Sequence, residues 1–176
     1  MHGLRNRERT EWIVVHCSKT HPNQRDTYGR QLGVQYIEYL HKAAGALSIG
    51  YHYLILRDGA TVETRHHSTI GNHCPGFNST SVGICLMGGV DRNGRHDPNF
   101  TKRQWQALNT LLDTLQRLYP DAEIVGHRDL SVGSADNECP SFDVAEWLAR
   151  QETRIIHKEQ SHDEPKTTDP RSPPLH

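Results

Sequence analysis

The sequence predicts one α/β domain in which a central mixed β-sheet is flanked by helices, and three observations support this prediction. The chain has 176 residues, a length that suits one domain with a proper hydrophobic core. Segments with the apolar patterns of strands and of helices alternate unevenly along it, without an internal repeat. One hairpin signal adds an antiparallel pair, which favours a mixed sheet packed by helices.

Several stretches have the composition of β-strands. "WIVVHCS" (12–18) is rich in β-branched residues, and "SVGICLMGG" (81–89) is a nearly unbroken apolar run, as expected for a strand buried on both faces. "YHYLILRDGATVETR" (51–65) reads as two strands joined by the Asp-Gly pair at 58–59, a strong hairpin signal. "AEIVGH" (122–127) is predicted to be a short last strand.

Two long stretches have helical spacing. "RQLGVQYIEYLHKAAGA" (30–46) repeats apolar residues at this spacing, and Gly45 is expected to end the helix. "TKRQWQALNTLLDTLQRLYP" (101–120) is the clearest helix, because Thr101 and Gln104 have the spacing of a capping box. Its expected buried stripe comprises Trp105, Leu108, Leu111, Leu112, Leu115 and Leu118.

The ends of the chain differ in composition from its middle. A final helix is predicted at 142–151, with Asp143 as its N-cap. Residues 157–176 hold Pro and charge with almost no apolar content, so they cannot bury enough surface to offset their ordering entropy. We therefore expect a flexible N-terminus at 1–10, a folded domain at 11–156 and a disordered tail at 157–176.

Charge and hydropathy exclude some functional classes. Lys and Arg number 20 against 21 Asp and Glu, so the formal charge is −1, and we expect no nucleic-acid binding. No stretch approaches the roughly 18 apolar residues of a membrane span, so no membrane insertion is expected. The first residues, "MHGLRNRERTEW", lack the apolar run of a signal peptide, which predicts a cytoplasmic protein.

In that compartment the four cysteines should be thiols or metal ligands rather than disulfides. Cys17 and Cys85 lie in apolar strands and are expected to be buried small hydrophobic residues. Cys74 lies in a loop and is expected to be more exposed.

The chemistry of the chain is expected at His16, His127 and Cys139. His16 lies near the end of the first strand, His127 at the end of the last, and Cys139 after the following loop. Two imidazoles and a thiolate would make a three-ligand zinc site whose fourth position is open to water, the arrangement of catalytic zinc. Zinc would lower the pKa of that water to about 7 and supply hydroxide. Spacing alone leaves two alternatives: satisfied core histidines, or a cysteine hydrolase with Cys139 as nucleophile and His127 as base.

A resemblance bears on these alternatives. The blocks "VVHCSKT", "IGYHYLILRDGATVE", "GNHCPGFNSTSVGICLMGGVD", "NFTKRQWQAL" and "CPSFD" resemble the type-2 N-acetylmuramoyl-L-alanine amidases, most closely the bacteriophage T7 lysozyme branch. The similarity runs in order from about residue 11 to 150. It implies a zinc amidase fold, a central mixed sheet flanked by helices, related to the peptidoglycan recognition proteins.

The resemblance also implies roles for single residues. It makes His16, His127 and Cys139 the ligands of Zn2+ and places Tyr51 beside the metal, where its phenol can stabilise the oxyanion or orient the water. His73 lies where the family has a histidine that lines the substrate groove. The alternatives are a core aromatic residue for Tyr51 and an exposed loop histidine for His73.

One position departs from the family pattern. The phage enzymes have a lysine two residues before the ligand cysteine, where it stabilises charge on the tetrahedral intermediate, and this chain has Asn137 there. Asn137 is expected to donate a neutral hydrogen bond to the oxyanion, weaker than a charged one. The glutamate that other family members place on the strand at 81–89 is also absent, since Cys85 and Met87 occupy that stretch.

The resemblance thus implies a zinc hydrolase that cuts the amide between N-acetylmuramic acid and L-alanine in peptidoglycan. We expect a monomeric phage or prophage endolysin, made in the host cytoplasm and released through a separate pore to the periplasmic cell wall. The alternatives are a peptidoglycan-binding module that no longer cuts and a regulator that binds a phage RNA polymerase through "MHGLRNRERTE". For that charged segment a solvated tail is the default.

Overall fold

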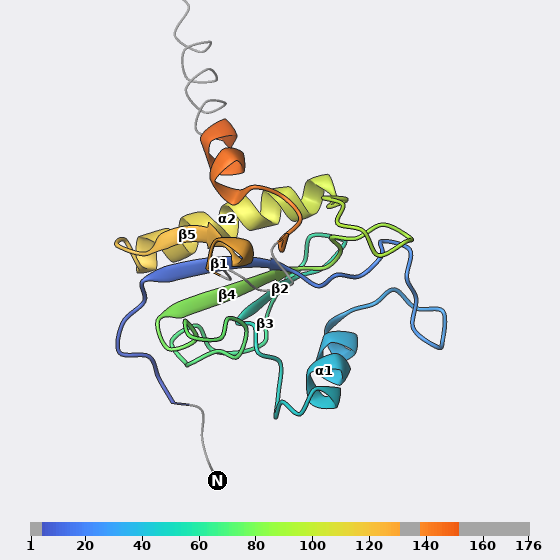
Figure 1. Ribbon diagram of the computed structural model, residues 1–176, viewed down its shortest axis with the longest axis horizontal. Helices are drawn as coiled ribbons and strands as arrows, with labels where there is room; N and C mark the ends of the chain where they lie inside the picture. Colours follow the sequence, from blue (N-terminus) through green and yellow to red (C-terminus); the bar gives the residue numbers. More distant parts are fainter. Residues whose placement is uncertain (1–4, 131–137, 152–176) are drawn as a thin grey trace, which may run out of the picture. The chain divides into compact units, whose positions relative to one another are not determined.

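The computed structural model describes residues 5–130 and 138–151, and a five-stranded sheet lies at its centre (Figure 1). The chain divides into two units, Met1–Ala145 and Glu146–His176, and the sheet belongs to the first. The strands are β1 (Trp12–Cys17), β2 (Tyr53–Ile55), β3 (Thr61–Glu63), β4 (Ser81–Leu86) and β5 (Glu123–Gly126). Their order across the sheet is β3-β2-β4-β1-β5.

The sheet is mixed, as the sequence predicts. β1 pairs with both β4 and β5 in parallel, and β2 is parallel to β4, whereas β2 and β3 form the antiparallel hairpin. Gly59 has a positive φ of 90° in the hairpin turn, a conformation that glycine adopts without strain. The Asp58 carboxylate accepts the backbone N–H of Ala60, which accounts for the Asp-Gly signal.

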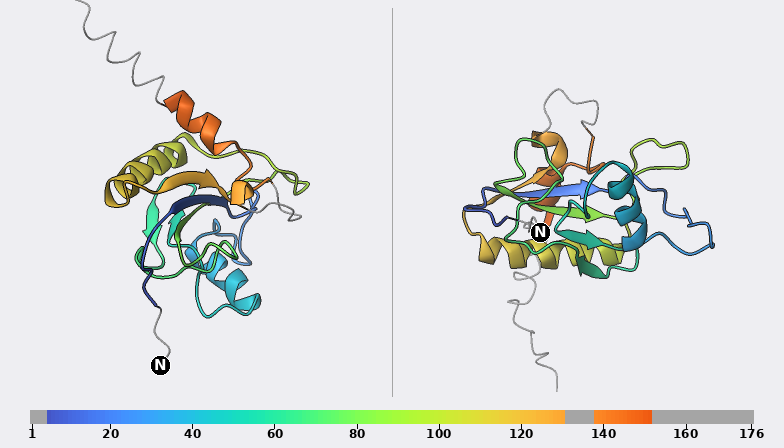
Figure 2. Two further views of the ribbon diagram at one scale, coloured as in Figure 1. Left: turned by 60° about the vertical axis from the view of Figure 1, so that its left-hand side comes forward. Right: turned by 90° about the horizontal axis from the view of Figure 1, so that it is seen from below.

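Two longer helices cover opposite faces of the sheet (Figures 1 and 2). They are α1 (Val34–Ala43) and α2 (Lys102–Leu118), and a short α3 (His127–Leu130) follows β5 directly. α1 begins later than predicted, at Val34, and it ends before Gly45, whose positive φ of 87° closes the helix as expected. No helix among the described residues has the length and apolar character needed to cross a bilayer.

The capping box predicted for α2 is present, but the buried stripe is narrower than predicted, since Leu108, Leu112 and Leu115 are buried whereas Trp105 and Leu111 are only partly buried. The Thr101 hydroxyl accepts the N–H of Gln104, and the Gln104 side chain accepts the N–H of Thr101. The prediction that Leu118 is buried was wrong, because it lies at the last turn with 50% of its surface exposed. Gln104 is instead fully buried, because its amide donates to the carbonyls of Ile55 and Met87.

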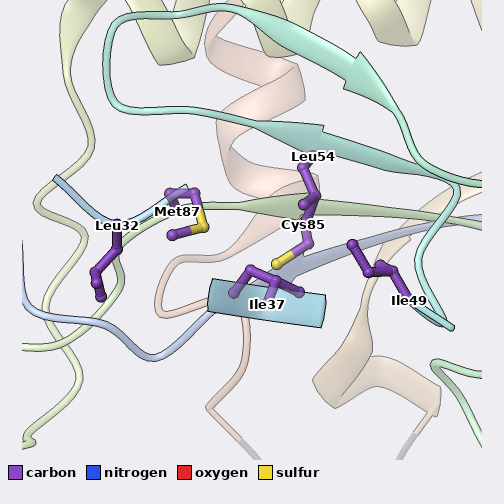
Figure 3. Close-up of a cluster of buried hydrophobic side chains, with 6 residues drawn as sticks. All are labelled: Leu32, Ile37, Ile49, Leu54, Cys85 and Met87. Atoms are coloured by element: carbon purple, nitrogen blue, oxygen red, sulfur yellow. The ribbon is translucent and has the colours of Figure 1, made fainter. Parts of the chain in front are cut away.

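A hydrophobic cluster lies between the sheet and α1. Cys85 belongs to it, and its sulfur is directed toward Ile37 of α1 (Figure 3). The cluster comprises Leu32, Ile37, Ile49, Leu54, Cys85 and Met87. Because His16 pairs with Cys85 across β1 and β4, the two side chains share one face of the sheet. The cluster therefore packs on the same face of the sheet as His16 and gives it apolar surroundings.

Two other expectations differ from the structure. Cys74 is 1% exposed, so the prediction of a more exposed loop cysteine was wrong, and its backbone N–H donates to the side chain of Asn78 within the same loop. Residues 5–10 were expected to belong to a flexible, solvated N-terminus, yet Asn6 bridges to Thr69 and Arg7 donates to the carbonyls of His67 and Thr69. Residues 144–151 are helical and follow Asp143, as the sequence predicts.

We predict that Gln104→Leu lowers the free energy of unfolding by about 2 kcal/mol, since it removes buried hydrogen bonds to two carbonyls together with half of the capping box. Urea denaturation of the two proteins measures the difference. Gln106→Leu, on the exposed side of the same helix, is the matched control and should change stability by less than about 0.5 kcal/mol. Equal losses in the two variants would contradict this account of Gln104.

We predict that stability falls with acid partly through His52. Its Nδ1 accepts the N–H of Gly83, and burial lowers its pKa to about 4. In the unfolded chain the pKa returns to about 6.5, so the unfolded state takes up the proton first as the pH falls. The contribution of His52 is therefore complete above about pH 6.5 and is lost toward pH 4, on the order of 3 kcal/mol in all. Urea unfolding across this range should show a shallower pH dependence for His52→Asn, and an unchanged slope would refute the assignment.

Candidate metal centre

The register of β1 against β5 brings two histidines together. Val15 pairs with Gly126, so the next residues along these parallel strands, His16 and His127, lie side by side at the carboxyl ends. Their ring centroids are 4.5 Å apart. His127 is the first residue of α3 rather than the end of a strand, because the chain turns into the helix directly after Gly126.

Cys139 returns to the same place from the following loop. The N–H of Arg128 donates to its carbonyl at 2.8 Å, and the N–H of Cys17 lies 3.4 Å from its sulfur. Cys139 is 2% exposed. One donor atom from each of His16, His127 and Cys139 lies within 4.8 Å of the other two, so the structure assembles the three predicted ligands into a group that could hold a metal ion.

Burial and neighbouring side chains shift the pKa values of His16 and Cys139. Burial and the nearby His73 and His127 lower the pKa of His16 well below its ordinary value, which keeps a lone pair on the ring at neutral pH. The hydrogen-bonded Cys17 thiol and burial raise the pKa of Cys139 well above its usual range.

Tyr51 lies against these ligands. Its ring centroid is 5.1 Å from that of His16 and also 5.1 Å from that of His41. The N–H of Gly50 donates to His41 at 2.9 Å, which anchors the residue before Tyr51. Burial, together with the thiol of Cys85, raises the pKa of Tyr51 well above 10, so its phenol keeps the proton that a hydrogen-bond donor needs.

His73 contacts the ligand His16 rather than lying exposed in its loop. Its Nδ1 is 3.0 Å from Nε2 of His16, its Nε2 is 3.3 Å from the Ser81 hydroxyl, and only 9% of its surface is exposed. The structure therefore brings Tyr51 and His73 to the metal-ligand group. Asn137 lies outside the described residues.

Sequence reasoning missed two members of this neighbourhood. Cys17 was expected to be only a buried apolar residue, but its backbone N–H reaches the sulfur of Cys139 and its own sulfur lies 4.0 Å away. Its position next to His16 at the end of a strand was the available signal. Ser81, which contacts His73, gave none, because nothing in the pattern of a buried strand marks one polar residue as a partner.

The sequence of the chain is similar to those of known phage proteins. The family model described as N-acetylmuramoyl-L-alanine amidase matches residues 6–142. The endolysin of Enterobacteria phage K11 is 42% identical over 142 residues, covering 81% of this chain and 87% of the relative. The endolysin of Escherichia phage T7 is 40% identical over 149 residues, covering 85% and 92%.

A solved structure extends the likeness to the fold. The endolysin N-acetylmuramoyl-L-alanine amidase LysCS from Clostridium intestinale URNW superposes with a TM-score of 0.67 at 25% identity, over 86% of this chain and 88% of that one. The family match spans most of the domain, including the whole sheet and both histidines of the candidate site. This chain therefore belongs to the N-acetylmuramoyl-L-alanine amidase family.

Proposed function

We propose that the protein is a zinc-dependent amidase that hydrolyses the bond between N-acetylmuramic acid and L-alanine in bacterial peptidoglycan. The observation that carries this proposal is the buried group of His16, His127 and Cys139, assembled by the sheet register within a family of amidases. A protein that used its histidines only as core residues would have no reason to gather two imidazoles and a thiol around one point.

The donor set fits zinc. Two imidazole nitrogens and one thiolate are among the ligand sets of catalytic zinc, and three protein ligands leave a position for water or substrate. When bound, zinc supplies Lewis-acid chemistry, polarising a carbonyl and lowering the pKa of a coordinated water to about 7. His16 presents a neutral ring, and the N–H of Cys17 lies where it can stabilise negative charge on the Cys139 sulfur.

In the proposed reaction Tyr51 is the hydrogen-bond donor for the substrate oxyanion. Its phenol stays protonated, and its ring is held between His16 and His41 beside the ligand group. A preorganised donor of this kind stabilises the charge that develops on the amide oxygen as the tetrahedral intermediate forms. We also propose that the Asn137 side chain donates a neutral hydrogen bond to the same oxygen, in place of the lysine that the phage enzymes have.

We further propose the biological setting of an endolysin, made in the host cytoplasm and acting on the periplasmic cell wall after release through a separate pore. The endolysins of phages K11 and T7 support this setting, since each is at least 40% identical over most of its length. The expected form is a monomer whose partner is the peptidoglycan itself.

We predict that the purified, zinc-loaded protein releases stem peptides beginning with L-alanine from Gram-negative sacculi and leaves the glycan strands intact. Mass spectrometry of the soluble products identifies the bond that is cut. Chelation should abolish release and added zinc should restore it, whereas a cysteine hydrolase would survive chelation and lose activity on thiol alkylation.

His127→Ala should lose both release and zinc, because only two ligands remain, while His66→Ala, at an exposed position, should keep both. Absence of release from a folded, zinc-loaded protein would refute the amidase and leave a peptidoglycan-binding module. Full activity in His127→Ala would refute the ligand assignment.

We predict that Tyr51→Phe lowers kcat by about 100-fold, since the variant loses the proposed oxyanion donor but keeps the aromatic ring. KM and zinc content should stay near those of the unsubstituted protein, because the phenol is not a ligand. Tyr39→Phe is the matched control, as Tyr39 lies on α1 with 66% of its surface exposed. If kcat were unchanged in Tyr51→Phe, the oxyanion would have a different donor.

A further inference from the structure

The loop at 71–81 forms a slot for the imidazole of His73. A Cβ atom added at Gly71 would lie 2.5 Å from Cδ2 of His73, and one added at Gly83 would lie 2.6 Å from its Cγ. Because both residues are glycines, no side chain occupies the space that the ring of His73 fills. The face of β4 that meets the ring is thus shaped for it.

The backbone that carries His73 is fixed independently of its ring. The Asn78 side-chain oxygen accepts the N–H groups of His73 and Cys74, at 2.8 and 2.9 Å. The N–H of Phe77 donates to the carbonyl of Cys74, and the N–H of Thr80 donates to that of Phe77. These bonds fold the loop upon itself and hold the backbone at His73 and Cys74.

A chain of hydrogen bonds defines which nitrogen of His73 carries the proton. The Ser81 hydroxyl donates its only proton to the carbonyl of Phe77 at 2.7 Å, so toward His73 it acts as an acceptor. Nε2 of His73 is then the donor, and in the neutral ring Nδ1 is the acceptor. The partner of Nδ1 at 3.0 Å is Nε2 of His16, which must therefore carry a proton and donate it.

We propose that His73 is a positioning residue for the metal centre, which holds His16 in the tautomer that leaves Nδ1 as its metal-binding nitrogen. Ligand histidines generally donate their second ring N–H to an acceptor that fixes their orientation, most often a carboxylate or a carbonyl. Here an imidazole, itself oriented by Ser81, takes that place. The inference rests on the proposed zinc function.

This role differs from the substrate contact that the family resemblance implies for His73. Both of its nitrogens are engaged within the protein, with His16 and with Ser81, so neither is left to bind a muropeptide. Its 9% exposure points the same way.

The first test is the zinc affinity of two variants, measured by competition with a chromophoric chelator. His73→Leu removes the acceptor and should weaken zinc binding by about 10- to 100-fold. His73→Asn should restore most of the affinity, because its side-chain oxygen is two bonds from Cβ, as Nδ1 is in histidine. His66→Leu, at an exposed position, should bind zinc as the unsubstituted protein does. Zinc affinity in His73→Leu equal to that of the unsubstituted protein would overturn the proposal.

The second test needs no variant at His73 and so does not depend on the folding of one. Long-range 1H–15N spectra of the imidazoles report the tautomer of each histidine, and both His16 and His73 should carry their proton on Nε2, with and without zinc. A proton on Nδ1 of His73 would overturn the proposal. If the protein bound no zinc at all, the proposed function would fail, while the spectra of the zinc-free protein would still decide the bond between His16 and His73.

Discussion

The parallel pairing of β1 with β5 is the constraint on which the rest of the site depends. Because Val15 faces Gly126, the two candidate ligand histidines follow at adjacent positions, His16 near the end of β1 and His127 directly after β5. A slip of one residue in this register would move His16 to the opposite face of the sheet. The register is secured by burial, since Ile13, Val14 and Val15 are all fully buried in β1, an inner strand of the sheet. The hydrophobic effect, acting along β1, thus fixes the distance between two polar ligands.

The two faces of the sheet have different roles: one holds α2 in place, and the other borders the candidate metal site. On one face Gln104 ties α2 to the ends of β2 and β4 through the carbonyls of Ile55 and Met87. On the other face Cys85 belongs both to the hydrophobic cluster under α1 and to the surroundings of Tyr51. A site whose neighbours are already packed would need little rearrangement to bind a metal ion, which is the condition for electrostatic preorganisation.

Three buried histidines can pack closely in this domain because their imidazole rings are neutral. His16, His52 and His73 lie close together with ring centroids 5.0 and 5.5 Å apart, and burial lowers the pKa of each. Three charged rings in this space would repel one another and lose their hydration. As neutral rings they donate and accept hydrogen bonds in a defined order, which runs from His16 through His73 to Ser81.

Much of the fold was predictable because it depends on local signals. The β-branched run before Cys17, the Asp-Gly turn and the capping box at Thr101 each report on neighbouring residues, and the structure confirms all three. Errors arose where solvent exposure was inferred from local pattern. Cys74 is buried by its folded loop and Leu118 is exposed at the last turn of α2, because exposure depends on what the rest of the chain places above a residue.

For the site, the sequence by itself indicated the three candidate ligands, through motifs that resemble those of the amidase family, and it placed His16 and His127 near the carboxyl ends of two strands. Only the tertiary structure decided that these strands are neighbours, that Cys17 donates to the ligand sulfur and that His73 contacts His16 rather than solvent. The physical reason is that periodicity gives the face of a strand on which a side chain lies, whereas its partner depends on contacts between residues distant in the chain. The bond between His16 and His73 joins residues 57 positions apart, beyond the reach of any local pattern.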